Sequence, residues 1–99
     1  MNITVNELKE RLTRHELIQL IDVRDVLEFH TFNIGGDNIP LGKLLTELDN
    51  LEYEKDQELV LVCQRGLRSE TARRLLTSQG YLNARNLTGG LLAWRRAEV

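Results

Sequence analysis

The apolar run Leu59-Val60-Leu61-Val62 constrains the fold more than any other segment of the chain. A strand that faces solvent on one side alternates apolar and polar residues, whereas this run is apolar at every position. Such a strand is buried on both faces, and its sheet therefore needs a covering layer on each side. A second, nearly continuous apolar run occurs at 17–23. We therefore expect an α/β fold in which helices cover both faces of a parallel sheet.

The rest of the chain alternates short apolar runs with amphipathic stretches. Besides 17–23 and 59–62, the pattern predicts a strand at 84–87 and allows a very short one at Asn38-Ile39 within an irregular loop. Helices are predicted at about 5–13, 26–30, 41–51, 69–79 and after Gly89-Gly90. This order of elements again favours a parallel sheet with crossover helices.

Polar side chains mark where several of these elements begin or end. Thr4 and Glu7 have the spacing of a capping box, in which a hydroxyl and a carboxylate bind free N–H groups at a helix start. Asp25 is a cap for the short helix that follows it. Asp22 and Arg24, at the end of an apolar run, fit a structural ion pair at a strand end. These five positions are therefore interpreted as structural.

Length, charge and cysteine count exclude several classes of protein. The 99 residues carry 13 Lys+Arg and 15 Asp+Glu, for a formal net charge of −2. This length predicts one domain, residues 1–99. The single Cys excludes an internal disulfide and a Cys-rich zinc module, and the mild acidity argues against nucleic-acid binding. No segment approaches the ~20 apolar residues that span a bilayer, and the N-terminus does not resemble a signal peptide. We expect a cytoplasmic protein with no metal site, membrane partner or nucleic-acid partner.

The single cysteine lies where the run 59–62 ends. After Cys63 come Gly66, which permits a tight turn, and the start of a helix with free N–H groups and a positive dipole end. Ligands of parallel α/β sheets bind at such strand ends. Arg65 and Arg68 add permanent positive charge, which favours both a thiolate and an anionic ligand. A lone Cys after an apolar strand is also a common core residue. The spacing alone leaves a nucleophile and an anion site open.

A resemblance to single-domain rhodaneses begins at this loop. Their active-site loop has the form Cys-x-x-Gly-x-Arg-Ser, and this chain has Cys63-Gln64-Arg65-Gly66-Leu67-Arg68-Ser69. Three further segments resemble family motifs in the same order, namely Ile21-Asp22-Val23-Arg24 with Glu28-Phe29, then Ile34 to Leu41, then Leu87-Thr88-Gly89-Gly90 with Ala93-Trp94. The resemblance covers nearly the whole chain. It implies a rhodanese-like α/β fold, with a central parallel sheet of about five short strands flanked by helices on both faces.

The resemblance also implies a sulfurtransferase in which Cys63 is the catalytic nucleophile. Cys63 takes the outer sulfur of thiosulfate or of a persulfide donor, and a thiol or cyanide then removes that sulfur. The residues implied to bind substrate are Gln64, Arg65, Gly66, Leu67, Arg68 and Ser69. Their backbone N–H groups surround the persulfide, the two arginines hold an anionic donor, and Ser69 is predicted to cap the helix. No cofactor is implied, and a sulfur-accepting protein fits as a further partner.

Two departures from the family pattern and two alternative functions bear on this interpretation. Phe32-Asn33-Ile34 stands where family members often have Gly-His-Ile, and 34–40 is one residue shorter than the family form.

A Cys-dependent phosphatase or arsenate reductase is the nearest enzymatic alternative. Tyrosine phosphatases place five residues between Cys and Arg, however, whereas Cys63 and Arg68 enclose four. A persulfide carrier or regulatory binding module is the alternative from another class. His30 is a candidate neighbour of the site, although a lone His is more often incidental.

Overall fold

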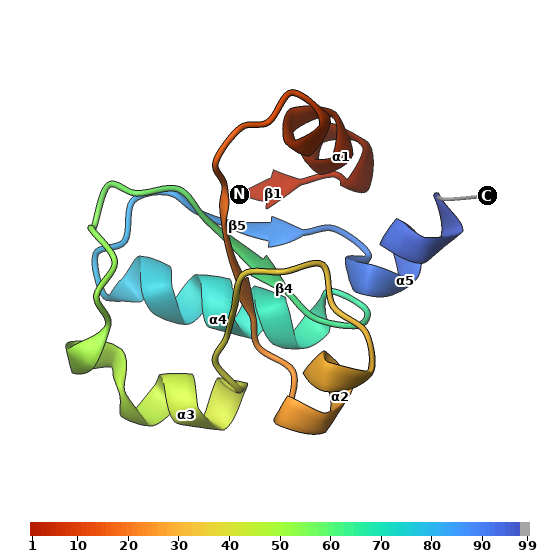
Figure 1. Cartoon of the computed structure of the whole chain (residues 1–99). Coiled ribbons are helices and arrows are strands. Elements are labelled where there is room, and N and C mark those ends of the chain that lie inside the picture. The colour runs from red at the N-terminus through yellow and green to blue at the C-terminus, as the bar shows by residue number, and fades with distance from the viewer. Residues whose placement is uncertain (98–99) are drawn as a thin grey trace.

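The sheet is built around the run Leu59–Val62, which forms a central strand in the computed structural model (Figure 1). The structure describes residues 1–97, and their strands are β1 Asn2–Ile3, β2 Gln19–Asp22, β3 Asp37–Asn38, β4 Leu59–Val62 and β5 Ala84–Leu87. All pairings are parallel, in the order β1-β5-β4-β2-β3, which confirms the predicted fold class. The helices are α1 Val5–Thr13, α2 Val26–Thr31, α3 Leu41–Thr46, α4 Leu67–Ser78 and α5 Gly90–Arg96. None of these helices is long and apolar enough to cross a membrane.

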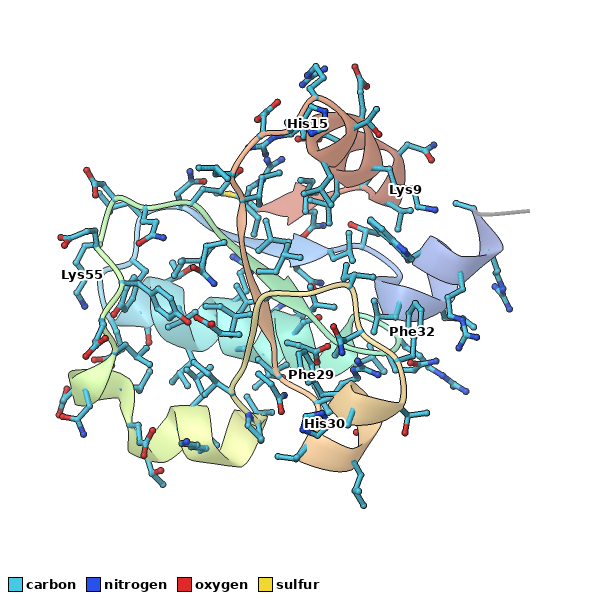
Figure 2. The ribbon with its side chains drawn as sticks, in the orientation of Figure 1. Lys9, His15, Phe29, His30, Phe32 and Lys55 are labelled. Carbon is cyan, nitrogen blue, oxygen red and sulfur yellow. The ribbon has the colours of Figure 1, made fainter. Side chains whose placement is uncertain are left out.

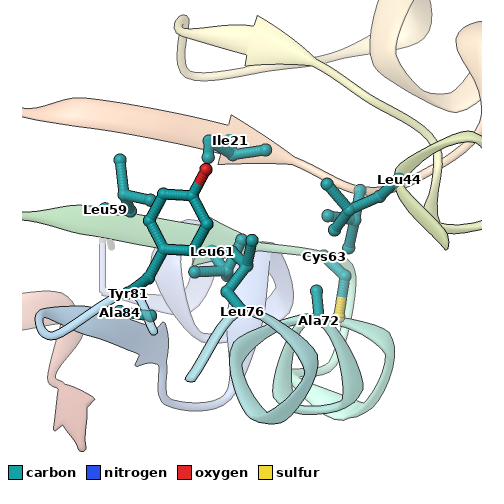
Figure 3. Packing of buried hydrophobic residues seen from close by; sticks show 10 residues of the cluster. Ile21, Leu44, Leu59, Leu61, Cys63, Ala72, Leu76, Tyr81 and Ala84 are labelled. Carbon is teal, nitrogen blue, oxygen red and sulfur yellow. The ribbon is translucent and has the colours of Figure 1, made fainter. Parts of the chain in front are cut away.

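Alternate side chains of β4 point to opposite faces of the sheet and meet different helices. Leu59 and Leu61 pack with side chains of α3 and α4, and Cys63, just beyond the strand, joins them (Figure 3). Val60 and Val62 pack on the other face, in a cluster to which α1 and α5 contribute. All five side chains are at most 1% exposed. The same alternation that buries the strand therefore directs the Cys63 side chain toward α4.

Three strands differ from the sequence prediction. β2 begins at Gln19, where its pairing with Leu59 of β4 starts, and not at Leu17, whose side chain is fully exposed. β3 covers Asp37–Asn38, one residue earlier than predicted. β1 was not predicted, since Asn2–Ile3 is only two residues long and is a strand through its pairing with β5. Strands this short are defined by their hydrogen-bonded neighbour, which local sequence does not report.

The helix predicted at 41–51 is shorter than expected. α3 ends at Thr46, where the N–H of Glu47 is shared between two carbonyl oxygens of the last turn. A short 3₁₀ turn follows, and Leu48 and Leu51 still pack against the core cluster on the α4 face. The regular leucine spacing at 41–51 thus indicates correctly which side of the segment is buried, although the α-helix itself ends at Thr46.

The capping box predicted at the start of α1 is only half formed. The hydroxyl of Thr4 accepts a hydrogen bond from the N–H of Glu7 at 3.1 Å. The carboxylate of Glu7 accepts from Arg85 on β5, also at 3.1 Å, and so does not return to the helix start. A tertiary ion pair therefore replaces the second bond of the local motif.

Side-chain bonds fix α2 beside the end of β2. Asp25 caps α2 as predicted, because its Oδ1 accepts a hydrogen bond from the N–H of Glu28 at 2.9 Å. The N–H of Asp25 donates in return to Oε1 of Glu28 at 3.3 Å, which completes a capping box. The predicted ion pair between Asp22 and Arg24 is present, buried and 2.8 Å long. The Arg24 guanidinium also donates to the carbonyl oxygen of Phe32 at 2.6 Å, just after α2. These contacts position Glu28 near the carboxyl end of the sheet.

Candidate active site

Cys63 follows β4 directly and points its side chain toward the start of α4 (Figure 3). Its Sγ accepts hydrogen bonds from the backbone N–H groups of Gly66 at 3.1 Å and Ser69 at 3.3 Å. Donors at a helix start have no carbonyl partner within the helix, so they are available to the sulfur. Two such donors stabilise negative charge on one atom. Cys63 is therefore a core residue at 1% exposure and, at the same time, part of an anion-binding turn.

Gly66 makes this turn possible. Its φ is +87°, in the left-handed region that residues with a Cβ rarely adopt. A Cβ at this position would also lie 3.2 Å from the backbone nitrogen of Gly89, which is an unusually close approach. The turn starts α4 at Leu67, two residues earlier than the sequence predicts.

The prediction that Ser69 caps α4 is wrong. Gly66 occupies the capping position, because its left-handed conformation already turns the chain into the helix, and Ser69 lies within the first turn. The Ser69 hydroxyl instead lies 2.5 Å from Oδ1 of Asn86 and 3.2 Å from Sγ of Cys63. Asn86, on β5, also donates to the carbonyl oxygen of Gly66 at 3.1 Å. An isolated Asn in a short strand gives no local signal, so sequence reasoning missed it.

The start of α5 supports the cysteine loop. The N–H of Leu91 donates to the carbonyl oxygen of Cys63 at 2.9 Å, and the N–H of Leu92 donates to that of Gln64 at 2.9 Å. The two backbones are so close that a Cβ on Gly90 would overlap the Cys63 carbonyl oxygen and lie 2.6 Å from that of Gln64. Close packing against the loop therefore explains the absence of a side chain at position 90.

A pocket of about 250 Å³ opens at the cysteine loop. The residues that line it are Glu28, Cys63, Gln64, Arg65, Leu67 and Arg68. Four of the six residues predicted to bind substrate thus line the pocket, and the other two, Gly66 and Ser69, contact the sulfur itself. The sequence placed Glu28 in a short predicted helix and in a motif-like segment but not in the pocket, because its place there depends on the packing of α2 beside α4.

The two arginines of the pocket are in different electrostatic states. Arg68 forms a two-armed ion pair with Glu28, at 2.7 Å and 2.9 Å. Arg65 is exposed and forms no ion pair with a carboxylate of residues 1–97. Arg65 is therefore the uncompensated positive charge at the pocket, whereas the charge of Arg68 is already balanced.

The ion pair between Arg68 and Glu28 is expected to make stability depend on pH. Hydrogen bonds from the Arg68 guanidinium are the main reason that the pKa of Glu28 is lowered from 4.5 to about 2. Because the folded-state pKa lies below the unfolded one, the stabilisation is complete above about pH 4.5 and is lost as the pH falls toward 2. The melting temperature of wild type should exceed that of Glu28→Gln near neutral pH, by a margin that shrinks below about pH 4.5. Thermal unfolding across this range tests it, and a margin that persists unchanged to the acid limit would contradict it.

His30 is not brought to the site. It lies on α2 with an exposed side chain (Figure 2), and its ring forms a T-shaped pair with the ring of Phe29, with the two centroids 5.7 Å apart. The residues that line the pocket at Cys63 do not include it. Across residues 1–97, no three His, Cys, Asp or Glu side chains cluster as metal ligands would.

Comparison with known proteins gives a consistent result. The family model of the Rhodanese-like domain matches residues 4–97. The thiosulfate sulfurtransferase GlpE of Shewanella oneidensis is 31% identical over 102 aligned residues, which cover 99% of this chain and 95% of GlpE. Among solved structures, the human single domain sulfurtransferase TSTD1 has a TM-score of 0.86 at 30% identity, with 99% of this chain and 97% of that one covered.

Other relatives are longer than this chain. The putative sulfur carrier protein YrkF of Bacillus subtilis is 29% identical over 93 residues, which cover 93% of this chain and 49% of YrkF. The chain spans about half or less of the length of several of the curated relatives it matches. The likeness to these longer proteins therefore concerns one part of each.

Proposed function

Because the chain belongs to the rhodanese-like domain family, we propose that it is a sulfurtransferase that carries a sulfane sulfur on Cys63. The proposed donor is thiosulfate or a persulfide, and the proposed acceptor is a thiol or cyanide. One observation carries the proposal: Sγ of Cys63 accepts two backbone hydrogen bonds and lines the same pocket as Arg65. The nearly full-length alignment with the sulfurtransferases GlpE and TSTD1 supports the same class of reaction.

In the first half-reaction, the Cys63 thiolate attacks the outer sulfur of thiosulfate. A sulfur–sulfur bond to Cys63 forms while the bond between the two thiosulfate sulfurs breaks, and sulfite leaves with the electron pair. Negative charge then lies on the outer sulfur of the Cys63 persulfide. The N–H groups in the first turn of α4, including those of Leu67 and Arg68, are available to bind this charge.

In the second half-reaction, an acceptor thiolate or cyanide attacks that outer sulfur. The bond to Cys63 breaks, Cys63 returns to the thiolate, and the product is a new persulfide or thiocyanate. Donor and acceptor react with the same sulfur in turn, so ping-pong kinetics are expected. A pocket of about 250 Å³ suits a small molecule. A protein acceptor would therefore have to present its thiol on a projecting segment.

Arg65 is the proposed binding group for the charged end of thiosulfate, because it carries a charge that no carboxylate of residues 1–97 balances. We expect Arg65→Gln to raise KM for thiosulfate by about 3–10-fold and to change transfer from an uncharged persulfide donor little. Steady-state kinetics with both donors measure this. Arg74→Gln is the matched control, since Arg74 is exposed on α4 and paired with Glu70. An equal loss with both donors would mean that Arg65 acts on Cys63 and does not bind the donor.

Intact mass measurement after incubation with thiosulfate tests the proposed function. The expected result is an adduct of one sulfur atom that cyanide removes, with thiocyanate as the product. An adduct that neither cyanide nor small thiols remove would favour the alternative of a persulfide carrier. The absence of both adduct and thiocyanate would overturn the proposal, and hydrolysis of a phosphate monoester measured in parallel would then favour the phosphatase alternative.

The proposed setting is the cytoplasm. Reducing conditions there keep an unpaired thiol free of disulfide bonds, and this chemistry depends on a free thiol. Neither a nucleic acid nor a membrane is part of the proposed reaction.

A further inference from the structure

We propose that Asn86 is a positioning residue for Cys63, because it holds the proton of the Ser69 hydroxyl and so makes Ser69 an acceptor for the thiol. Sγ of Cys63 lies 3.2 Å from Oγ of Ser69, which lies 2.5 Å from Oδ1 of Asn86. The three residues are 1%, 0% and 7% exposed. Buried polar atoms need hydrogen-bond partners among their neighbours. The hydrogen bonds among these three side chains therefore determine where their protons lie. The inference rests on the proposed role of Cys63 as nucleophile but concerns its ionisation only.

The orientation of the Asn86 amide follows from the groups that it meets. Its Nδ2 lies 3.1 Å from the carbonyl oxygen of Gly66, which can only accept a hydrogen bond. Exchanging the amide nitrogen and oxygen would set two acceptors against each other at Gly66. The amide nitrogen therefore faces Gly66, and the amide oxygen faces Ser69. Asn86 thus presents an acceptor to the Ser69 hydroxyl.

The Ser69 hydroxyl has a single proton to donate. Its 2.5 Å distance to Oδ1 of Asn86 is at the short end for an O–H···O bond, so the proton lies on this side. Oγ then turns a lone pair toward Cys63, and the thiol S–H is the donor in the 3.2 Å contact. The Ser69 side chain therefore stabilises the thiol, whereas the backbone N–H groups at the sulfur stabilise the thiolate.

Ionisation of Cys63 brings these two preferences into conflict. A thiolate has no proton to offer, and a lone pair of Ser69 directed at it is unfavourable. Ser69 can turn its hydroxyl toward the sulfur only by leaving the amide oxygen of Asn86 without a donor in a buried place, which costs free energy. The hydrogen bond that Asn86 accepts from Ser69 therefore favours the thiol form of Cys63 over the thiolate.

Charged groups also act on the sulfur, and they are the same in every variant below. Arg65 and Arg68 line the pocket from the loop and α4, and Glu28 faces it from α2. The ion pair of Asp22 and Arg24 lies at the end of β2, the strand that pairs with β4. Since the variants keep all five groups, a change in the ionisation of the thiol reports the hydrogen bonds of Ser69 and Asn86.

The test measures the rate of Cys63 alkylation by iodoacetamide as a function of pH. Asn86→Leu should lower the pH midpoint by about half to one unit, because the freed Ser69 hydroxyl can donate to the thiolate at no cost. Ser69→Ala should lower it as well, because the thiol loses its acceptor. A serine that simply donated to the sulfur would give the opposite sign, and a rise with Ser69→Ala would overturn the inference.

A double variant separates this effect from a loosened loop. Asn86→Leu should cause no further shift in the Ser69→Ala background, where no hydroxyl proton remains to be freed; a shift that survives there would overturn the inference. Asn38→Leu is the matched control, since Asn38 donates to two carbonyl oxygens at the end of β2 and should leave the midpoint unchanged. If Asn86→Leu does not fold, the direction in which Ser69→Ala shifts the pH midpoint of alkylation decides whether the inference holds. A one-sulfur adduct with unshifted midpoints would reject the role of Asn86 and keep the proposed function.

Discussion

Replacement of Cys63 by Ser is expected to abolish the one-sulfur adduct and to lower sulfur transfer to cyanide by at least about 10³-fold. A serine hydroxyl ionises far less readily than a thiol and does not take up sulfane sulfur. A serine Oγ can still accept hydrogen bonds from the N–H groups of Gly66 and Ser69, so the free energy of unfolding should change by only about 1 kcal/mol. Intact mass, thiocyanate formation and thermal unfolding of the same preparation measure all three effects.

The composition of the chain sharpens this experiment. Cys63 is the only cysteine, so any sulfur bound to a thiol must be bound to it. Wild-type protein alkylated with iodoacetamide provides an independent control, because it keeps every other side chain and should also fail to form the adduct. An adduct that persists in folded Cys63→Ser would contradict the proposed mechanism.

The centre of the fold was predictable because each signal there is local. The run Leu59–Val62 is apolar at every position, which only a strand buried on both faces explains. Gly66 and Cys63 likewise lie within four positions of each other, so their turn could be read directly from the sequence. By contrast, Asn2–Ile3 becomes a strand through β5, more than eighty residues away, and its own two side chains carry no pattern.

The parts of the candidate site that sequence reasoning missed depend on distant pairs. Arg68 and Glu28 are 40 positions apart, and Ser69 and Asn86 are 17 apart. In the sequence these four residues lie apart, and only the packing of α2 and β5 against α4 brings each pair together. Ser69 was misinterpreted for a related reason, since a serine near a helix start is a common cap and only the left-handed φ of Gly66 removes that need.

Gly90→Ala is expected to cost both stability and activity. The φ of Gly90 is +61°, and the added Cβ would overlap the carbonyl oxygen of Cys63 and lie 2.6 Å from that of Gln64. Backbone atoms cannot move aside as a side chain can, so α5 must shift and weaken the bonds that Leu91 and Leu92 donate to the loop. Left-handed strain and overpacking together predict a loss of about 2–5 kcal/mol. Displacement of Cys63 by a few tenths of an ångström should also lower kcat for sulfur transfer by at least about 10-fold.

Gly80→Ala separates the overlap at Gly90 from conformational strain. Gly80 also has a positive φ, +94°, but a Cβ there would meet nothing within 4 Å. Gly80 follows the C-terminal end of α4, and Cys63 precedes the other end of that helix. Its replacement should therefore lower the free energy of unfolding only by the conformational strain, about 1–2 kcal/mol, and leave kcat unchanged. Urea unfolding and steady-state kinetics of the two variants give the comparison. If both variants lose the same stability and Gly90→Ala keeps its kcat, then contact with α5 does not hold the cysteine loop in its reactive position.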